Sequence, residues 1–482
     1  MIIKNKYQVV IGLEVHAQLL TKSKLFCADS TAFGGEPNTQ VSPVSLAHPG
    51  TLPVMNKAVI ELAVKLGLAM HCQIEQHNYF ARKNYFYPDL PKGYQVSQHT
   101  TPICKGGYLA IQTIDGEKKV KLNRIHMEED AGKSIHDIDE NYTCIDLNRA
   151  GMPLLEIVTE PDLHSSDEAY TYLTELRKLV RWIGVCDGNM EEGSMRCDAN
   201  ISIRLKGETR LNTRVEVKNL NSIRNVKKAI EAEAERLIEL TENNQPVIQQ
   251  TRSFDADSNT TFALRSKEEA DDYRYFPEPD LPPFFISEKY IQTVKDSMPV
   301  LPATLQQKYT AKYKLSVYDA AVICGDKEDA DLFEQLIEHS SNYKAVANWI
   351  IGPLRSYCNE NNISLSQFPL QPAAIGALIN MTDTGQVSFN NASGKILQAL
   401  IAEPEKNPLQ IATALNLLQE SDTGAIEAWV ESVIEAMPQK VKEYKAGKKN
   451  LQGLFAGEVK RLSKGKADMQ LVNKLLAEKL NN

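Results

Sequence analysis

The stretch VKLNRIHMEEDAGKS, residues 120–134, decides how the first half of the chain is interpreted. It predicts a strand over Lys121 to Met127 that runs into Glu128, Glu129 and Asp130 and then into a glycine turn. Three adjacent carboxylates repel one another, so burying them without a cation is costly. A run of charges on its own is most often solvated surface. A divalent metal site and a solvated loop therefore both remain open at this point.

Two further strands carry ionisable side chains among apolar ones. Residues 9–19 alternate in polarity, so Glu14 and His16 share one face of a half-buried strand. Such a pair can bind a cation, although the spacing alone favours an ion pair on a strand face. Glu156 lies between apolar neighbours on a short strand over residues 154–158. A carboxylate in that position needs a cation, a metal or a backbone donor as its partner.

The elements that follow give the first domain an α+β pattern. Ser165 and Glu168 form a capping box for a helix that ends near Ile183, and a second helix is predicted over residues 223–240. Asp198 opens the polar face of a strand whose return partner covers residues 214–218, which predicts an antiparallel hairpin. We expect residues 249–283 to be irregular, with their proline-rich end near a domain boundary.

An irregular loop is predicted from Phe80 to Tyr94, where cations mix with aromatic rings. It contains too many prolines and aromatic residues for a helix. Cations beside aromatic faces suit stacking on a base or holding a phosphate. The alternative, that the aromatic rings fill the core, is equally compatible with the pattern.

Domain boundaries are predicted from the change in pattern along the chain. Residues 1–290 form a cradle domain on an antiparallel sheet with helices, residues 291–405 form a helical domain, and residues 406–482 form a helical tail domain. From Lys440 to Lys466 the tail carries nine basic residues against two acidic ones, with glycine turns between them. Such a patch suits contact with the phosphates of a folded RNA, and solubilising surface charge is the alternative.

Composition bounds the possible functions. The 482 residues allow two to four domains, and 42% hydrophobic with 24% charged residues is ordinary for a globular protein. A net charge of −8 argues against general coating of nucleic acid but leaves room for a local basic patch. The eight cysteines are scattered and form no C-x-x-C pair, and no segment has the apolar length to span a bilayer. We therefore expect a cytoplasmic protein without membrane contact.

Several long segments together resemble the B subunits of glutamyl/aspartyl-tRNA amidotransferases. They occur in order along essentially the whole chain and are VIGLEVH (residues 10–16), RKNYFYPDLPKGYQVSQ (82–98), HMEEDAGKS (126–134), DLNRAGMPLLEIVTEPD (146–162), MEEGSMRCDANI (190–201) and EVKNLNSIR (216–224), with Asp271 to Pro282 and the lysine-rich tail. The resemblance departs at Ala81, where an acidic residue is expected. That position touches none of the expected metal ligands.

The resemblance implies an ATP- and Mg²⁺-dependent ligase that forms carbon–nitrogen bonds. Such a protein phosphorylates the side-chain carboxylate of Glu-tRNA(Gln) or Asp-tRNA(Asn), and ammonia from a partner amidase (glutaminase), the A subunit of the same complex, then completes the amide. A small C subunit joins the two. This chain has no serine- and glycine-rich stretch that could supply a glutaminase nucleophile, so its ammonia must come from another chain. It also has no Walker-type loop for binding nucleotide phosphates.

The resemblance also implies roles for individual residues. The metal ligands are expected to be Glu14, His16, Glu128, Glu129 and Glu156, with Glu129 favoured over Glu128 as the direct ligand. Catalytic roles are expected for Glu129, Lys83 and Asp198, and binding of nucleotide or substrate for Arg82, Lys83, Lys218 and Asn219. The tail is expected to contact tRNA through Lys448, Lys449, Lys464 and Lys466. Two other functions stay open, a non-catalytic tRNA-binding scaffold and a metal-dependent carboxylate ligase that acts on a small molecule.

Overall fold

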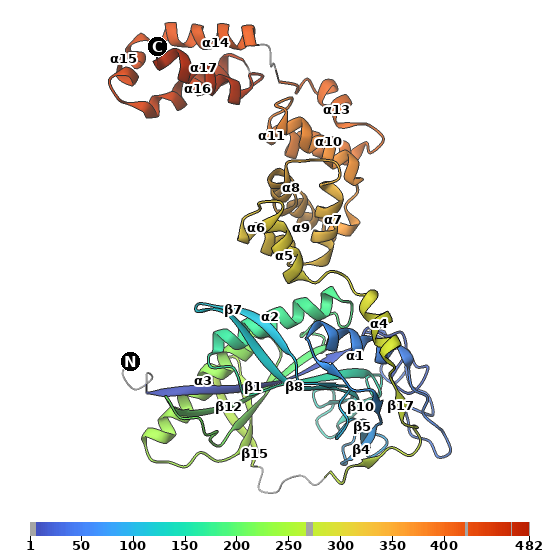
Figure 1. The fold of residues 1–482 in the computed structure, drawn as a ribbon. Coiled ribbons are helices and arrows are strands. Elements are labelled where there is room, and N and C mark those ends of the chain that lie inside the picture. The colour runs from blue at the N-terminus through green and yellow to red at the C-terminus, as the bar shows by residue number, and fades with distance from the viewer. Residues whose placement is uncertain (1–5, 267–272, 420–422, 464, 482) are drawn as a thin grey trace. The chain divides into compact units, whose positions relative to one another are not determined.

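A computed structural model describes residues 6–266, 273–419, 423–463 and 465–481. The chain divides into two compact units, Met1–Leu301 and Pro302–Asn482. The first unit is rich in sheet and the second is helical (Figure 1). This confirms the predicted α+β class, with an antiparallel cradle followed by an all-helical region. Within the described residues, no helix combines the length and the apolar character that crossing a membrane requires.

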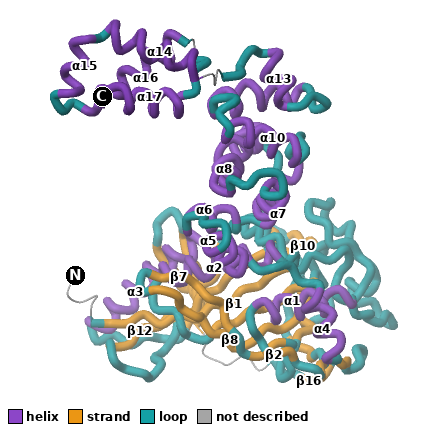
Figure 2. The backbone as a smooth tube through the Cα atoms, turned by 45° about the horizontal axis from the view of Figure 1, so that its top comes forward, coloured by secondary structure: helices purple, strands orange, loops and turns teal. Residues whose placement is uncertain are grey.

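A ten-stranded sheet forms the centre of the first unit (Figure 2). Its strand order is β15-β14-β13-β12-β1-β11-β8-β6-β2, and β7 pairs with β8 off this path. Neighbouring strands of this sheet are antiparallel, except that β13 and β14 are parallel. The strands are β1 (Tyr7–Gln18), β2 (Gln73–Ile74), β6 (Cys104–Lys105), β7 (Tyr108–Thr113), β8 (Gly116–Glu129), β11 (Pro153–Thr159), β12 (Met195–Leu205), β13 (Val215–Leu220), β14 (Gln250–Asp255) and β15 (Thr260–Ser266).

Smaller sheets and four helices surround this sheet. The small sheets pair β9 (Lys133–Ile135) with β10 (Cys144–Asp146), β3 (His77–Asn78) with β17 (Phe284–Phe285), and β5 (Tyr94–Ser97) with β4 (Ala81–Asn84), which also pairs with β16 (Phe276–Pro277). The helices are α1 (Lys57–Ala69), α2 (Ser166–Trp182), α3 (Ile223–Glu242) and α4 (Glu288–Asp296).

The central strands have one apolar and one polar face because their residues alternate. On β1, Leu13 and Val15 are buried, whereas the intervening Glu14 and His16 are half-buried. Helices α2 and α3 pack against each other, and α3 also contacts β12. Leu173 and Leu176 of α2 belong to the buried core. The opposite, polar face of the sheet is where the ionisable side chains of β1, β8 and β11 gather.

The second unit consists of short helices. They are α5 (Pro302–Ala311), α6 (Val317–Ile323), α7 (Lys327–Leu336), α8 (Tyr343–Trp349), α9 (Arg355–Asn361), α10 (Pro372–Asp383), α11 (Phe389–Asn391), α12 (Leu397–Ala402), α13 (Pro408–Ala414), α14 (Thr423–Ala436), α15 (Pro438–Lys445), α16 (Gln452–Leu462) and α17 (Met469–Asn481). In the described part of this unit, the π-helical turns Ile350–Leu354 and Ala392–Ile396 and the 3₁₀ turns Leu365–Gln367 and Lys449–Leu451 connect some of them. The last helices enclose their own apolar core around Val430, Phe455 and Leu476.

Most predicted elements are confirmed, and two regions differ. One is the irregular loop predicted from Phe80 to Tyr94, because Ala81–Asn84 forms strand β4 and pairs with β5. The helix predicted after Ser165 is α2, and the Ser165 side chain accepts a hydrogen bond from the Glu168 backbone N–H as expected. The predicted hairpin is β12 with β13. Residues 249–283 are not wholly irregular, because β14 and β15 form an antiparallel pair at the edge of the large sheet. Gln250–Asp255 has polar residues at most positions, so its hydrophobic pattern does not identify it as a strand.

Candidate metal and substrate site

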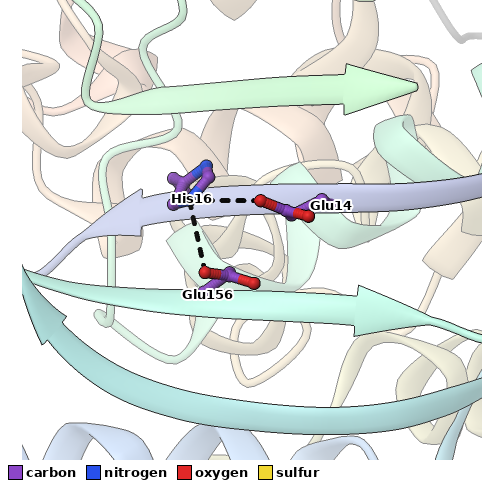
Figure 3. Close-up of side chains that lie close together, drawn as sticks. All are labelled: Glu14, His16 and Glu156. Atoms are coloured by element: carbon purple, nitrogen blue, oxygen red, sulfur yellow. Dashed lines mark ion pairs between the residues drawn. The ribbon is translucent and has the colours of Figure 1, made fainter. Parts of the chain in front are cut away.

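Ionisable side chains from three neighbouring strands converge on the polar face of the large sheet. Strand β1 pairs with β11 and places His16 opposite Glu156, and β11 pairs with β8 and places Glu156 opposite His126. Figure 3 shows Glu14 and His16 on β1 beside Glu156 on the adjacent strand. We call Glu14, His16, His126, Glu128 and Glu156 the carboxylate–histidine cluster. Its members come from distant parts of the sequence, and strand pairing brings them together.

Distances within the cluster are short enough for shared ligation. His16 Nε2 lies 3.8 Å from Glu14 Oε1 and 3.6 Å from Glu156 Oε2. The sets Glu14, His16, Glu156 and His126, Glu128, Glu156 each offer ligand atoms within 4.8 Å of one another. Glu156 belongs to both sets, so it links the two halves of the cluster.

Glu128 completes the second half of the cluster. Its Oε1 lies 3.6 Å from His16 Nε2, and its Oε2 lies 3.5 Å from His126 Nε2. The hydroxyl of Ser97 on β5 donates a hydrogen bond to the same Oε2 at 3.2 Å. Strand β5 therefore borders the cluster at the Glu128 end.

Burial and mutual charge shift the pKa values of the cluster. Burial alone would lower the pKa of His126, but the Glu156 and Glu128 carboxylates outweigh it and raise that pKa to about 9. Burial alone would raise the pKa of Glu156, yet His126 and His16 hold it well below its usual range. Burial, together with the charge of Glu156, raises the pKa of Glu14. Imidazoles between carboxylates thus hold the cluster together electrostatically.

Glu129 does not lie in this cluster, contrary to the expectation that it is the direct ligand. Its Oε1 accepts a hydrogen bond from the Val96 backbone N–H at 2.8 Å, and its Oε2 pairs with the Lys92 ammonium. Glu128 and Glu129 are consecutive on β8, so their side chains point to opposite faces. Glu129 instead lines a cavity of about 120 Å³ together with Lys92 and Tyr94.

Asp198 and Lys218 lie beside the cluster as a pair. Asp198 is opposite Glu14 in the pairing of β1 with β12. Lys218 Nζ lies 2.5 Å from Asp198 Oδ2 and 3.1 Å from Glu216 Oε1. Burial alone would lower the pKa of Lys218, but Asp198 and Glu216 raise it instead. Lys218 is therefore a retained positive charge at the edge of the cluster.

Arg82 and Asn219 have different environments. Arg82 is held by Glu278, with Nε to Oε2 at 2.7 Å, and its guanidinium lies over the Tyr94 ring at 4.1 Å. The Asn219 side-chain amide donates a hydrogen bond to the Ser253 hydroxyl at 2.7 Å and so links β13 to β14. Its backbone has a positive φ of 62°. Both side chains are engaged in maintaining the fold.

Lys83 faces aromatic rings rather than a carboxylate. Its ammonium lies 4.8 Å from the centre of the Tyr273 ring and 5.7 Å from that of Tyr85. Nearby, Tyr275 stacks on His99 with ring centres 4.0 Å apart and planes at 11°. Burial and the charge of Glu128 raise the pKa of Tyr275 to about 12, which indicates that these rings lie close to the cluster.

The basic residues of the tail are partly engaged within the tail itself. Lys448 Nζ lies 3.0 Å from Glu443 Oε2, and Lys466 Nζ donates to Asn416 Oδ1 at 3.2 Å. Lys449 donates to Asn481 Oδ1 at 2.9 Å and lies over the Tyr444 ring at 4.1 Å. Lys464 lies outside the described residues.

Sequence reasoning missed three side chains that the strands bring to the cluster. His126 had a usable signal, because it is two residues before Glu128 on one strand, as Glu14 is two residues before His16. Arg124 Nη2 lies 4.0 Å from Glu156 Oε1. Arg196 is opposite His16 and pairs with Asp130 at 2.6 Å, and its buried Nε has no hydrogen-bond partner among the described residues. The two arginines had no signal of their own, because only the strand register places them.

Comparisons with known proteins cover almost the whole chain. The family description "GatB/GatE catalytic domain" matches residues 9–292, and "GatB domain" matches residues 331–480. The B subunit of the aspartyl/glutamyl-tRNA(Asn/Gln) amidotransferase of Myxococcus xanthus (strain DK1622) is 48% identical over 476 residues, which is 99% of each chain. The protein of the same name from Geotalea uraniireducens (strain Rf4) is 49% identical over 482 residues, 99% of this chain and 100% of its own.

Proposed function

Because the chain belongs to the GatB family of amidotransferase B subunits, we propose that its carboxylate–histidine cluster is the centre at which an ATP-dependent carboxylate activation takes place. The chain is the catalytic B subunit of a tRNA-dependent amidotransferase, a ligase of the class EC 6.3.5.-, which converts misacylated Glu-tRNA(Gln) or Asp-tRNA(Asn). The convergence of three carboxylates and two imidazoles on one sheet face carries the proposal.

The donor set of the cluster fits a divalent cation. Three buried or half-buried carboxylates gathered around His16 repel one another, and a cation bound among them would relieve this repulsion. The ligands would be Glu14, His16, Glu128 and Glu156, with His126 beside them. An oxygen-rich set suits Mg²⁺, and the imidazoles would also accept Mn²⁺. When bound, the cation supplies charge neutralisation for the phosphates of ATP.

The residues around the cluster would bind and orient the two substrates. Phosphorylation of a side-chain carboxylate requires the carboxylate oxygen and the terminal phosphate to approach although both are negative. Arg124 at one edge and Lys218 at the other supply the positive charge that offsets this repulsion. Lys83 and the aromatic rings at the Glu128 end would contact the aminoacylated end of the tRNA.

Ammonia would reach the activated carboxylate from a separate amidase, the A subunit, with a small C subunit in the same complex. Each of three regions would have its own role. Residues 1–290 would activate the carboxylate, residues 291–405 would connect this region to the tail, and residues 406–482 would contact the tRNA. Lys448, Lys449 and Lys466 are our candidates for that tRNA contact, and Lys464 is a further candidate from the sequence alone.

The test is an assay of the full chain co-purified with its partner subunits. Misacylated Glu-tRNA(Gln) and Asp-tRNA(Asn) are supplied with ATP, Mg²⁺ and glutamine or free ammonium, and both amide formation and phosphate release are measured. We expect phosphate release that depends on the misacylated tRNA and falls by at least a hundredfold in Glu156→Gln. Glu117→Gln, an exposed position on β8, is the matched control and should retain full activity.

Two outcomes would replace the proposal by one of its alternatives. A chain that binds tRNA but never hydrolyses ATP in its presence would be a scaffold. Carboxylate activation that proceeds without tRNA, and is unchanged when residues 406–482 are deleted, would indicate an enzyme for a small-molecule carboxylate.

A further inference from the structure

Two cysteines that are far apart in the sequence meet at one edge of the large sheet. Cys72 lies between α1 and β2, and Cys104 is the first residue of β6. In the antiparallel pairing of β2 with β6, Ile74 is opposite Cys104. The alternation of strand residues puts Cys72, two residues before Ile74, on the same side as Cys104. The pairing that ends the sheet therefore also brings the two thiols together.

Each sulfur also packs against the backbone of the other segment. A Cβ added at Gly67, in α1, would lie 2.5 Å from Cys104 Sγ. A Cβ added at Gly107, just after β6, would lie 2.6 Å from Cys72 Sγ. The backbone N–H of Cys72 donates a hydrogen bond to the Gly67 carbonyl at 2.8 Å. Residues 67–72 and 104–107 thus contact each other through both cysteines, and glycine at these two positions leaves room for the sulfurs.

The two thiols are in contact, and both cysteines are free. A hydrogen bond with Cys72, together with burial, raises the pKa of the Cys104 thiol well above its ordinary value. Cys104 is fully buried, whereas Cys72 is half-buried, so a reagent in solution reaches Cys72 first. One thiol is thus accessible, and its buried neighbour is placed to react with a group that forms on it.

We propose that Cys72 and Cys104 form a reversible disulfide, which makes this edge of the first unit a redox-sensitive site. The oxidant is a low-molecular-weight disulfide. The Cys72 thiolate attacks one of its sulfurs, which releases the other as a thiol and leaves a mixed disulfide on Cys72. Cys104 then attacks the Cys72 sulfur, displaces the second small thiol and closes the protein disulfide. The two protein sulfurs lose two electrons in total, the oxidant gains them, and both protons leave on the two small thiols.

The disulfide would close a loop over residues 72–104, which borders the carboxylate–histidine cluster. Within this loop the Ser97 hydroxyl donates a hydrogen bond to Glu128 Oε2 at 3.2 Å, and the Val96 N–H donates one to Glu129 Oε1 at 2.8 Å. A bond at the base of the loop restricts both the unfolded chain and local opening of the folded one. Oxidation would therefore stabilise the segment that contacts β8, without adding or removing a group at the cluster.

The experiment treats the folded, full-length chain with oxidised glutathione and reverses the reaction with dithiothreitol. Digestion without reduction, followed by mass spectrometry, identifies the peptides that are joined. We expect a link between the peptides of Cys72 and Cys104 in the wild type, its absence in Cys72→Ser and its retention in Cys144→Ser. Cys144 is the matched control, because it is also half-buried and lies on β10, away from this edge of the sheet.

Thermal melting and hydrogen exchange measure the effect of the disulfide on the fold. The oxidised wild type should melt about 5 °C higher than the reduced one, as expected for a disulfide that closes a loop of this length. Exchange of the backbone amides of residues 73–103 should slow, whereas exchange in residues 302–419 should stay unchanged. Cys72→Ser treated with the oxidant should behave as the reduced wild type in both measurements.

Several results would overturn the inference. One is a folded wild-type chain in which Cys72 and Cys104 stay unlinked, or become linked only in urea. Another is a stable mixed disulfide on Cys72 that Cys104 does not displace. A link that forms without slowing exchange in residues 73–103 would contradict the stabilising effect. These measurements involve neither ATP nor tRNA, so their outcome is independent of the proposed function.

Discussion

Glu128 and Glu129 are adjacent on β8, yet their carboxylates lie on opposite faces of the sheet. Glu128 Oε1 lies 3.6 Å from His16 Nε2, whereas Glu129 Oε1 accepts a hydrogen bond from the Val96 backbone N–H at 2.8 Å. The metal centre that we propose therefore uses the first of the two residues. Glu129 stabilises the loop that carries Lys92, on the other side of the strand.

The two residues should respond differently to the same substitution. Glu128→Gln removes a ligand, so we expect its affinity for Mn²⁺, used as a spectroscopic probe, to fall by about 10–100-fold. Glu129→Gln should bind Mn²⁺ within twofold of the wild type but unfold at lower temperature, because Lys92 loses its buried partner. Glu117→Gln controls for the loss of a charge on β8. Equal loss of Mn²⁺ affinity in both variants would contradict this assignment of the faces.

Arg82 and Lys83 give a second pair of neighbours with separable roles. Arg82→Ala leaves the Glu278 carboxylate buried without its partner, and we expect it to lower the unfolding free energy by about 3 kcal/mol. Lys83→Ala breaks only contacts with rings and should leave stability within about 1 kcal/mol. It should instead raise the KM for misacylated tRNA. Calorimetric melting and steady-state kinetics of both variants check the prediction, which fails if Lys83→Ala melts as early as Arg82→Ala.

The tail lysines should determine the salt dependence of tRNA binding. If Lys448, Lys449 and Lys466 contact phosphates, replacing all three by alanine should weaken binding and reduce the slope of log K against log salt by about 2–3. The control is Lys479→Ala, because Glu427 already holds that ammonium at 2.6 Å. An unchanged salt slope in the triple variant would show that these lysines are only solvated surface charge.

The helical unit offers a prediction about acid stability. The Lys344 ammonium, 2.6 Å from Asp319 Oδ2, and the Ser316 hydroxyl lower the pKa of Asp319. A carboxyl whose pKa is lower in the folded state adds stability that is present above its unfolded pKa, about 3.9, and is lost as the pH falls through the folded value. Asp319→Asn should therefore destabilise this unit by about 1 kcal/mol at pH 7 and by nothing near pH 2.

Calorimetry of the full chain at several pH values checks this prediction. Asp331→Asn is the control, because Asp331 pairs with Lys327 on an exposed helix surface and should change stability by no more than about 0.5 kcal/mol at any pH. A constant difference between Asp319→Asn and the wild type down to pH 2 would show that the charge of Asp319 is not what stabilises the unit.

Sequence patterns predicted those features that depend on local chemistry. The alternation of Val9 to Leu19 gave β1 and the shared face of Glu14 and His16, and the capping box of Ser165 gave the start of α2. Strand β14 lies between β13 and β15, and the sequence does not indicate it because its buried residues Thr251, Arg252 and Ser253 are polar. Strand β15 is at the edge of the sheet, where a strand needs little apolar character.

Features that depend on pairing between distant strands could not be read from the chain. Nothing near Arg196 in the sequence indicates that it lies opposite His16, since the register of β1 with β12 alone places it there. The choice between Glu128 and Glu129 has the same origin. It requires the pairing of β8 with β11, in which His126 is opposite Glu156 and Glu128 is opposite Leu154.

The pairing of β1, β11 and β8 also limits which insertions and deletions these strands can accept during evolution. Inserting or deleting one residue within a strand moves every following side chain of that strand to the other face. Deleting one residue of β8 before His126 would put Glu129 in the place of Glu128 and remove His126 from the cluster. The irregularity between Val158 and Thr159, beyond the ligands, is where β11 already tolerates such a shift. We therefore expect length variation among relatives to be confined to the loops and to that position, with substitutions as the only route by which the centre itself can vary.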